Sequence, residues 1–150
     1  MRIRPYTPAD REFVLSLAPR LLVGAAPWLD PERMLVAVRQ WITDSITKHG
    51  GETMVFVAED ASQKRLGFVS VAHKRHFTGE PLAYIGELAV AEAVEGRGVG
   101  RELVRACEQW AHVQGYGQCA LETGFANERG RRFYERLGFK EESVRLVRVF

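Results

Sequence analysis

The sequence predicts an α/β (α+β) protein built on a mixed central sheet, and two observations carry this prediction. Three segments of strand-like composition, residues 53–59, 66–74 and 82–90, follow one another through short polar connections, which is the pattern of an antiparallel meander. A glycine-rich segment then leads into a stretch of helical periodicity at 101–114, and a further strand pattern follows at 118–123. This strand–helix–strand order predicts a crossover that makes the fourth and fifth strands parallel.

Two helices are expected before the meander. After a short first strand at residues 3–6, Thr7 is a candidate N-cap with Pro8 in the first helical turn, and this helix is expected to end by Pro19. A second helix is expected after the N-cap Asp30 and before Gly50. Its apolar stripe, assigned to the core, consists of Met34, Leu35, Val38, Trp41, Ile42 and Ile46.

The C-terminal part of the sequence predicts one more helix and one more strand. Asn127 begins a short helix that Gly138 ends, and residues 142–150 alternate in the manner of a last strand. If that strand lies at a sheet edge it can pair across a homodimer.

Composition limits the class of protein. The 150 residues predict a single domain over 1–150, and 46% hydrophobic with 27% charged residues is average for a globular protein. No apolar run approaches the roughly 20 residues that cross a bilayer, so we expect no membrane partner and a cytoplasmic protein. The net charge of +2, with acids and bases interspersed, argues against a nucleic-acid partner.

Cysteine and histidine usage argues against metal or redox chemistry. Cys107 and Cys119 are expected to be small buried side chains rather than a disulfide pair. The four histidines show no metal-ligand spacing with these cysteines, so we predict no metal site.

The segment Gly96-Arg97-Gly98-Val99-Gly100 is the most informative part of the chain. Three glycines in five residues leave the backbone accessible, and the helix that follows presents unpaired N–H groups and the positive end of its dipole. Together these features predict an anion site that suits a pyrophosphate. The alternative from the residues alone is an ordinary glycine-rich turn that caps a surface helix.

Two motifs make the chain resemble the GNAT superfamily of acetyl-CoA-dependent N-acetyltransferases over nearly its whole length. The glycine-rich segment from Glu95 to Gly100 is similar to the family's cofactor signature, and Asn127, the pair Phe133-Tyr134 and Gly138-Phe139 are similar to its C-terminal pattern. The resemblance implies a GNAT-like fold with six to seven strands, four main helices, and splayed parallel strands four and five.

The resemblance further implies acetyl-CoA as co-substrate. The residues it assigns to the cofactor are Leu88, Ala89, Val90, Glu95, Gly96, Arg97, Gly98, Val99, Gly100, Arg101, Asn127 and Tyr134. Glu95 departs from the family pattern, which has arginine or glutamine there, and a carboxylate near a pyrophosphate should weaken binding unless Arg97 or Arg101 compensates.

Acetyl transfer from a thioester to an amine needs a base and an acid. Glu87 is the candidate base; strand alternation places it on the face of Ile85 and Ala89, and the alternative is a solvent-facing strand carboxylate. Tyr134 is the candidate acid for the departing thiolate, and the alternative is a core aromatic side chain. No nucleophile triad is visible, so direct attack in a ternary complex is expected.

The acceptor is expected to be a primary amine on a small molecule or peptide. Candidate acceptor-binding residues, each also open to interpretation as plain packing, are Trp28, Tyr84, Glu122 and Thr123. An alternative function is a non-catalytic acyl-CoA-binding sensor or partner-binding module of the same fold.

Overall fold

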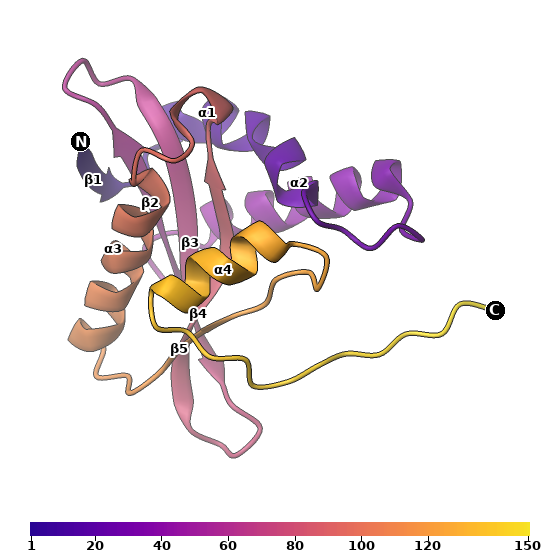
Figure 1. Cartoon of the computed structure of the whole chain (residues 1–150). Coiled ribbons are helices and arrows are strands. Elements are labelled where there is room, and N and C mark those ends of the chain that lie inside the picture. The colour runs from indigo at the N-terminus through magenta and orange to yellow at the C-terminus, as the bar shows by residue number, and fades with distance from the viewer.

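A five-stranded mixed sheet forms the centre of the computed structural model, which describes residues 1–150 (Figure 1). The strands are β1 (Arg2–Pro5), β2 (Thr53–Glu59), β3 (Arg65–Arg75), β4 (Pro81–Val90) and β5 (Cys119–Leu121). They lie in the order β1-β2-β3-β4-β5, with antiparallel pairing up to β4 and parallel pairing between β4 and β5. The predicted meander and crossover are therefore confirmed.

Four α-helices accompany the sheet, as predicted: α1 (Arg11–Ser16), α2 (Pro31–Thr47), α3 (Val99–Val113) and α4 (Glu128–Arg136). Short 3₁₀ helices are η1 (Pro8–Asp10), η2 (Ala18–Leu22) and η3 (Glu92–Val94). The first predicted helix is thus one short α-helix between two 3₁₀ turns. The N-cap of α2 is Asp30, whose carboxylate accepts from the backbone N–H of Glu32 at 2.8 Å.

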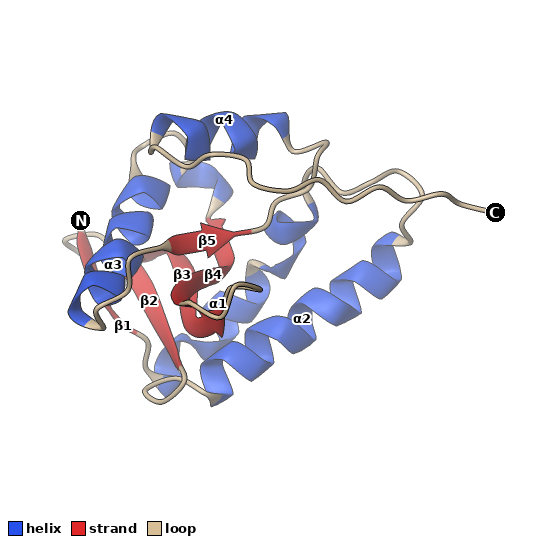
Figure 2. Cartoon of the chain, turned by 90° about the horizontal axis from the view of Figure 1, so that it is seen from below, coloured by secondary structure: helices blue, strands red, loops and turns tan.

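The helices cover both faces of the sheet (Figure 2). On one face α3 closes a cluster of buried residues: Ala58, Leu66, Val69, Val71, Ala83, Ile85, Val99, Leu103, Val104, Cys107 and Ala111. On the other face α1 and α2 close a second cluster: Val14, Leu17, Ala18, Val38, Ile42, Ile46, Val55, Val57, Phe68 and Ala89. The sheet is therefore buried between two helical layers, which explains the nearly continuous apolar runs in β2 and β3.

Two predictions about the sheet and core are wrong. Residues 140–150 form no strand, so the sheet has five strands and not six to seven. Alternation indicates only that a segment is compatible with a sheet. In this structure residues 142–150 have no strand beside them with which to pair. Trp41 is 57% exposed on α2, because the apolar stripe of this helix is wider than the surface that the sheet covers.

A buried ionic network joins β1 to η1 and β3. The carboxylate of the fully buried Asp10 accepts from Arg4 at 2.7 and 2.9 Å and from Arg65 at 2.6 Å. Burial alone would raise the pKa of Asp10, but the hydrogen bonds from Arg4 and Arg65 outweigh it and hold the pKa well below its usual range. Arg4 also pairs with Glu59 of β2 at 2.7 Å.

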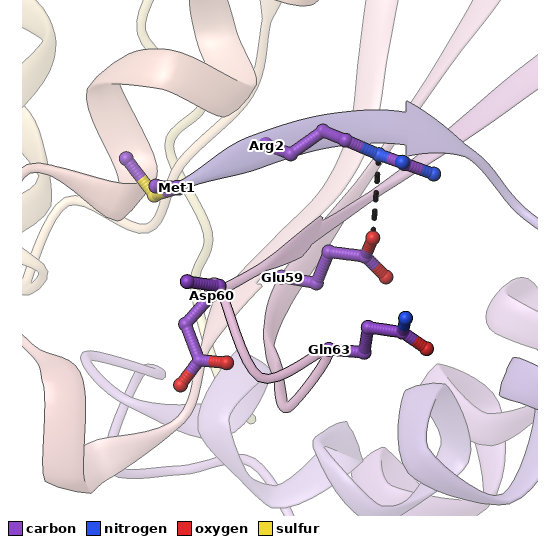
Figure 3. Close-up of a pocket in the computed structure, with 6 residues that line it drawn as sticks. Met1, Arg2, Glu59, Asp60 and Gln63 are labelled. Carbon is purple, nitrogen blue, oxygen red and sulfur yellow. Dashed lines mark ion pairs between the residues drawn. The ribbon is translucent and has the colours of Figure 1, made fainter.

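A shallow pocket of about 260 Å³ lies beside this network, at the β1 edge of the sheet (Figure 3). Its walls include Met1, Arg2, Glu59, Asp60 and Gln63, and the 3.3 Å ion pair between Arg2 and Glu59 crosses it. Because β1 is the edge strand opposite β5, this pocket is separate from the site described below.

We expect Asp10→Asn to destabilise the protein by about 3–5 kcal/mol at pH 7, since two arginines lose a buried partner. The folded pKa of Asp10 lies below the unfolded value, so its contribution is present at neutral pH and fades as the pH falls below about 4. Urea unfolding at several pH values measures both effects. Asp44→Asn, on the exposed surface of α2, is the matched control, and an equal loss in that variant would contradict the prediction.

Candidate functional site

A β-bulge interrupts β4 at the centre of the sheet. Val69 lies opposite Leu88 and Val71 lies opposite Ile85, so Ser70 alone faces two residues of β4, Gly86 and Glu87. A side chain at position 86 would meet the Ser70 hydroxyl, since a Cβ there would lie 2.8 Å from its Oγ. Glycine at position 86 therefore leaves room for the Ser70 hydroxyl beside β4.

The bulge changes which residues of β4 share a face. Ile85 packs in the cluster under α3, whereas Ala89 packs in the cluster under α1 and α2. The predicted common face of Ile85, Glu87 and Ala89 is therefore wrong for Ile85, because strict alternation fails across an extra residue. Counting back from Ile85 places Tyr84 on the α2 side, with Glu87.

Glu87 is buried between the sheet and α2, with 6% of its surface exposed. Its Oε2 accepts from Ser45 Oγ of α2 at 2.9 Å and from Ser70 Oγ, while Ser70 Oγ accepts from the Glu87 backbone N–H at 3.0 Å. Its hydrogen-bond partners are hydroxyl groups, and no arginine or lysine forms an ion pair with it. A solvent-facing carboxylate is thus excluded, and the group is free to accept a proton without breaking an ion pair.

The second half of β4 has an open edge. β5 pairs only with Ala83–Ile85, so Leu88, Ala89 and Val90 have β3 on one side and no strand on the other. Their outward N–H and C=O groups are available to an extended ligand that lies along the strand.

The glycine-rich segment adjoins this open edge, but its three glycines serve different purposes. Gly96 and Gly98 have positive φ angles, +78° and +82°, with nothing within 4 Å of a Cβ built on either. Gly100 lies at a close contact, because a Cβ built on it would lie 3.3 Å from the Phe133 ring of α4 and 3.8 Å from Val90 Cγ2. The segment therefore combines an open backbone with a close contact between α3 and α4.

The first turn of α3 is left available for an anion. Gly98 is the N-cap and offers no side chain to the N–H groups that follow it, while Val99 is buried and anchors the helix start. Arg97 and Arg101 are exposed and form no ion pair. This arrangement fits a phosphate group held by backbone N–H groups and flanked by two cations.

Glu95 pairs with two arginines from elsewhere in the fold. Its carboxylate lies 3.1 Å from Arg20 of η2 and 2.9 Å from Arg129 at the start of α4. The structure thus gives the unexpected acid its own counter-charges, in addition to the nearby Arg97 and Arg101. Arg20 was missed by sequence reasoning because no local pattern relates η2 to the glycine-rich segment.

The α4 helix carries the remaining motif residues. Asn127 is its N-cap: Oδ1 accepts from the Gly130 N–H at 3.0 Å, and Nδ2 donates to Thr123 Oγ1 at 3.0 Å. Tyr134 is partly buried, with its ring edge-on to Phe139 at a centroid distance of 5.7 Å. Burial raises the pKa of Tyr134 to about 12, so its phenol stays protonated at neutral pH.

The candidate acceptor-binding residues are spread over three elements. Tyr84 on β4 is half-buried, and burial raises its pKa, which the negative charges of Glu122 and Glu87 raise further. Glu122 and Thr123 are exposed after β5, and Trp28 is exposed on the connection between η2 and α2. Glu87 and Glu122 are therefore both near Tyr84, whose ring also lies 3.7 Å from Lys74 Nζ, whereas Trp28 lies on a separate loop.

That loop nevertheless packs against the start of α4. Gly24, with φ of +79°, lies so close to Asn127 that any side chain would clash with it, and a Cβ on Gly124 would lie 2.7 Å from the Gly24 carbonyl oxygen. The connection that carries Trp28 and the connection between β5 and α4 are thus in direct contact.

Neither cysteine is activated as a nucleophile. Cys107 and Cys119 are both free, and burial raises the pKa of Cys107 well above its usual range and that of Cys119 to about 11. At neutral pH both are thiols rather than thiolates.

No group of three or more His, Cys, Asp or Glu side chains is arranged to share a metal ion. None of the helices has both the length and the apolar composition that a membrane span requires.

Known proteins resemble the chain in sequence and in fold. N-acetyltransferase 8F1 of Rattus norvegicus is 29% identical over an alignment of 143 residues that covers 92% of this chain; the chain spans 62% of the length of that relative. A Pyrococcus furiosus protein assigned as an acetyl transferase superposes with a TM-score of 0.79 at 21% identity, covering 99% of each chain. The aminoglycoside 6'-N-acetyltransferase of Acinetobacter haemolyticus superposes with a TM-score of 0.70 at 17% identity, covering 100% of this chain and 99% of that one.

The similarity to the two solved structures shows a shared fold. The sequence itself matches the Acetyltransferase (GNAT) family over residues 17–139, a stretch that includes β2 to β5, the glycine-rich segment and α4. The mixed sheet with a parallel β4–β5 pair agrees with the fold that the resemblance implied, except that it has five strands and not six to seven. The chain belongs to the acetyltransferase (GNAT) family.

Proposed function

We propose that this protein is an N-acetyltransferase that moves an acetyl group from acetyl-CoA to a primary amine by direct attack in a ternary complex. One observation carries the proposal: the open edge of β4 and the uncapped start of α3 adjoin, with Val90 Cγ2 3.8 Å from a Cβ built on Gly100. An extended chain with a pyrophosphate at one end matches these two features.

The residues of this region suit acetyl-CoA. The backbone from Gly96 to Arg101 would bind the pyrophosphate, with Arg97 and Arg101 adding charge-assisted hydrogen bonds. The open edge formed by Leu88, Ala89 and Val90 would pair with the pantetheine arm. Asn127, the N-cap of α4, is proposed to contact the same arm. When bound, acetyl-CoA supplies an acyl group activated as a thioester.

Glu87 is proposed to accept the proton of the incoming amine. Two serine hydroxyls donate to its carboxylate, and no cation pairs with it. The carboxylate therefore has lone pairs left to accept the proton of the amine, directly or through one water. Glu122 is a second carboxylate close enough to act on Tyr84, and Lys74 Nζ lies 3.7 Å from the centroid of the Tyr84 ring, so charges of both signs surround this part of β4.

Tyr134 is proposed to return a proton to the departing thiolate. Because burial raises its pKa to about 12, the phenol is in its donating form throughout the physiological range. Trp28 and Thr123 are proposed to line the acceptor side. The names of the rat relative and of the aminoglycoside-modifying neighbour support an amine acceptor, which for this chain remains part of the proposal.

The alternative of a non-catalytic acyl-CoA-binding module would draw support from Glu95 if its charge impaired the site, but Arg20 and Arg129 pair with that carboxylate. Turnover with any amine would exclude it.

Calorimetric titration with acetyl-CoA tests the cofactor site. We expect saturable binding that weakens by about 10–100-fold in Arg97→Ala or Arg101→Ala, since each arginine loses a charge-assisted hydrogen bond. Arg105→Ala is the matched control, because Arg105 lies one turn further along α3 and pairs with Glu102 at 2.7 Å. No binding at millimolar acetyl-CoA, or equal weakening by the control, would refute the site.

The same titration tests whether the negative charge of Glu95 weakens acetyl-CoA binding. If its charge repels the cofactor, Glu95→Gln should tighten binding; because two arginines already neutralise it, we expect no tightening.

Initial-rate kinetics with an amine panel test the chemistry. Glu87→Gln and Tyr134→Phe should each lower kcat by about 10²–10⁴-fold with little change in acetyl-CoA affinity, since each removes one proton-transfer group. Cys119→Ser should retain activity. Because the pKa of Tyr134 is raised, the rate should show no loss from its ionisation below about pH 11. Parallel double-reciprocal lines, the pattern of a ping-pong reaction, would contradict direct attack.

A further inference from the structure

The two hydroxyl groups that contact the Glu87 side chain both donate to the same carboxylate oxygen. Ser45 Oγ of α2 lies 2.9 Å from Glu87 Oε2, and Ser70 Oγ of β3 donates to that atom as well. Oε1 accepts no hydrogen bond from the protein. The only fully buried side-chain nitrogen or oxygen without a partner is His76 Nε2, so Oε1, which also has none, is in contact with solvent. The carboxylate therefore has one anchored oxygen and one open oxygen.

Ser70 is part of the β-bulge as well as a partner of the carboxylate. Its Oγ accepts from the Glu87 backbone N–H at 3.0 Å and donates to Oε2, and the residue is 2% exposed. Removing this hydroxyl would leave a buried backbone N–H without a partner, which costs stability. A Ser70 variant would therefore change the fold and the carboxylate together.

Ser45 contacts only the carboxylate of Glu87, and it does so in a way that is unusual for a serine inside a helix. Such hydroxyl groups often donate to the carbonyl oxygen four residues earlier. Thr43 donates in this way to the Arg39 carbonyl at 2.8 Å, and Thr47 donates to the Thr43 carbonyl at 2.7 Å. Ser45, which lies between these two threonines, instead donates to a side chain 42 residues further along the chain.

The packing of α2 holds Ser45 beside Glu87. Ile42 precedes Ser45 by three residues and so lies next to it on the helix surface, and Ile46 follows it directly. Both isoleucines are buried in the cluster between α2 and the sheet, whereas Ser45 is partly buried at its border. The Ser45 hydroxyl is thus fixed by its helix and does not depend on Glu87 for its position.

We infer that Ser45 is a positioning residue for the proposed acetyl transfer: by anchoring Oε2 it directs Oε1 toward solvent and the incoming amine, and Oε1 is the atom that takes the proton. The inference rests on the proposed function. An amine that arrives as R–NH₃⁺ loses one proton from its nitrogen, and the O–H bond forms on Oε1, so that Glu87 becomes neutral. The electron pair of the broken N–H bond then attacks the thioester carbonyl, and Glu87 later releases the proton to solvent. No bond to Ser45 forms or breaks.

Steady-state kinetics and calorimetry of Ser45→Ala test this role. Ser70 alone would then anchor Oε2 and the carboxylate could rotate, so we expect kcat to fall by about 10-fold, the effect of one hydrogen bond to a charged group. The Kd for acetyl-CoA should stay unchanged. Thr47→Ala is the matched control, because it removes a hydroxyl of the same helix that bonds only to the helix backbone, and it should retain kcat.

A double variant separates positioning from a general weakening of the fold. In a Glu87→Gln background no base remains to be positioned, so adding Ser45→Ala should lower kcat no further, whereas damage to the fold would add to the loss. An additive loss would overturn the inference. A loss in Glu87→Gln without one in Ser45→Ala would also overturn it and would leave the proposed base in place. Full activity in Glu87→Gln would overturn the base and the inference together.

The contact itself is tested without any acceptor. In isotopically labelled protein, the ¹³Cδ chemical shift of Glu87 should change in Ser45→Ala and not in Thr47→Ala, because only Ser45 hydrogen-bonds this carboxylate. An unchanged shift in Ser45→Ala would contradict the anchoring of Oε2 and with it the inference.

Discussion

The bulge at Gly86 and Glu87, opposite Ser70, is the constraint on which the candidate site depends. One extra residue in β4 turns Glu87 toward α2, where Ser45 and Ser70 hold its carboxylate. Pairing with β5 ends at Ile85, immediately before the bulge. The same local feature thus positions the proposed base and marks the start of the open backbone edge that leads to α3.

Charge balance around the glycine-rich segment follows from tertiary contacts. Glu95 alone would oppose an anion, but Arg20 and Arg129 approach it from two other elements. α3 and α4 also pack closely in this region, where the Phe133 ring of α4 lies beside Gly100 of α3. The proposed cofactor site therefore involves α4 and η2 as well as the glycine-rich segment.

Local patterns predicted the strand order, the four helices and the N-caps Asp30 and Asn127, since each depends on residues close in sequence. Strict alternation could not predict the bulge, although a glycine within a strand, here Gly86, often indicates one. The ion-pair partners of Glu95, Arg20 and Arg129, lie far from it in the sequence, so no local pattern predicts them. Residues 142–150 were predicted as a strand because alternation describes the segment alone and carries no information about a neighbouring strand.

Amide chemical shifts of the isotopically labelled protein, followed during titration with acetyl-CoA, test the central claim most directly. The largest changes should occur at Leu88, Ala89 and Val90 and at the amides from Gly98 to Arg101, because both backbone segments are proposed to hydrogen-bond the cofactor. Shifts confined to other regions, such as the pocket at the β1 edge, or none at all, would contradict the account.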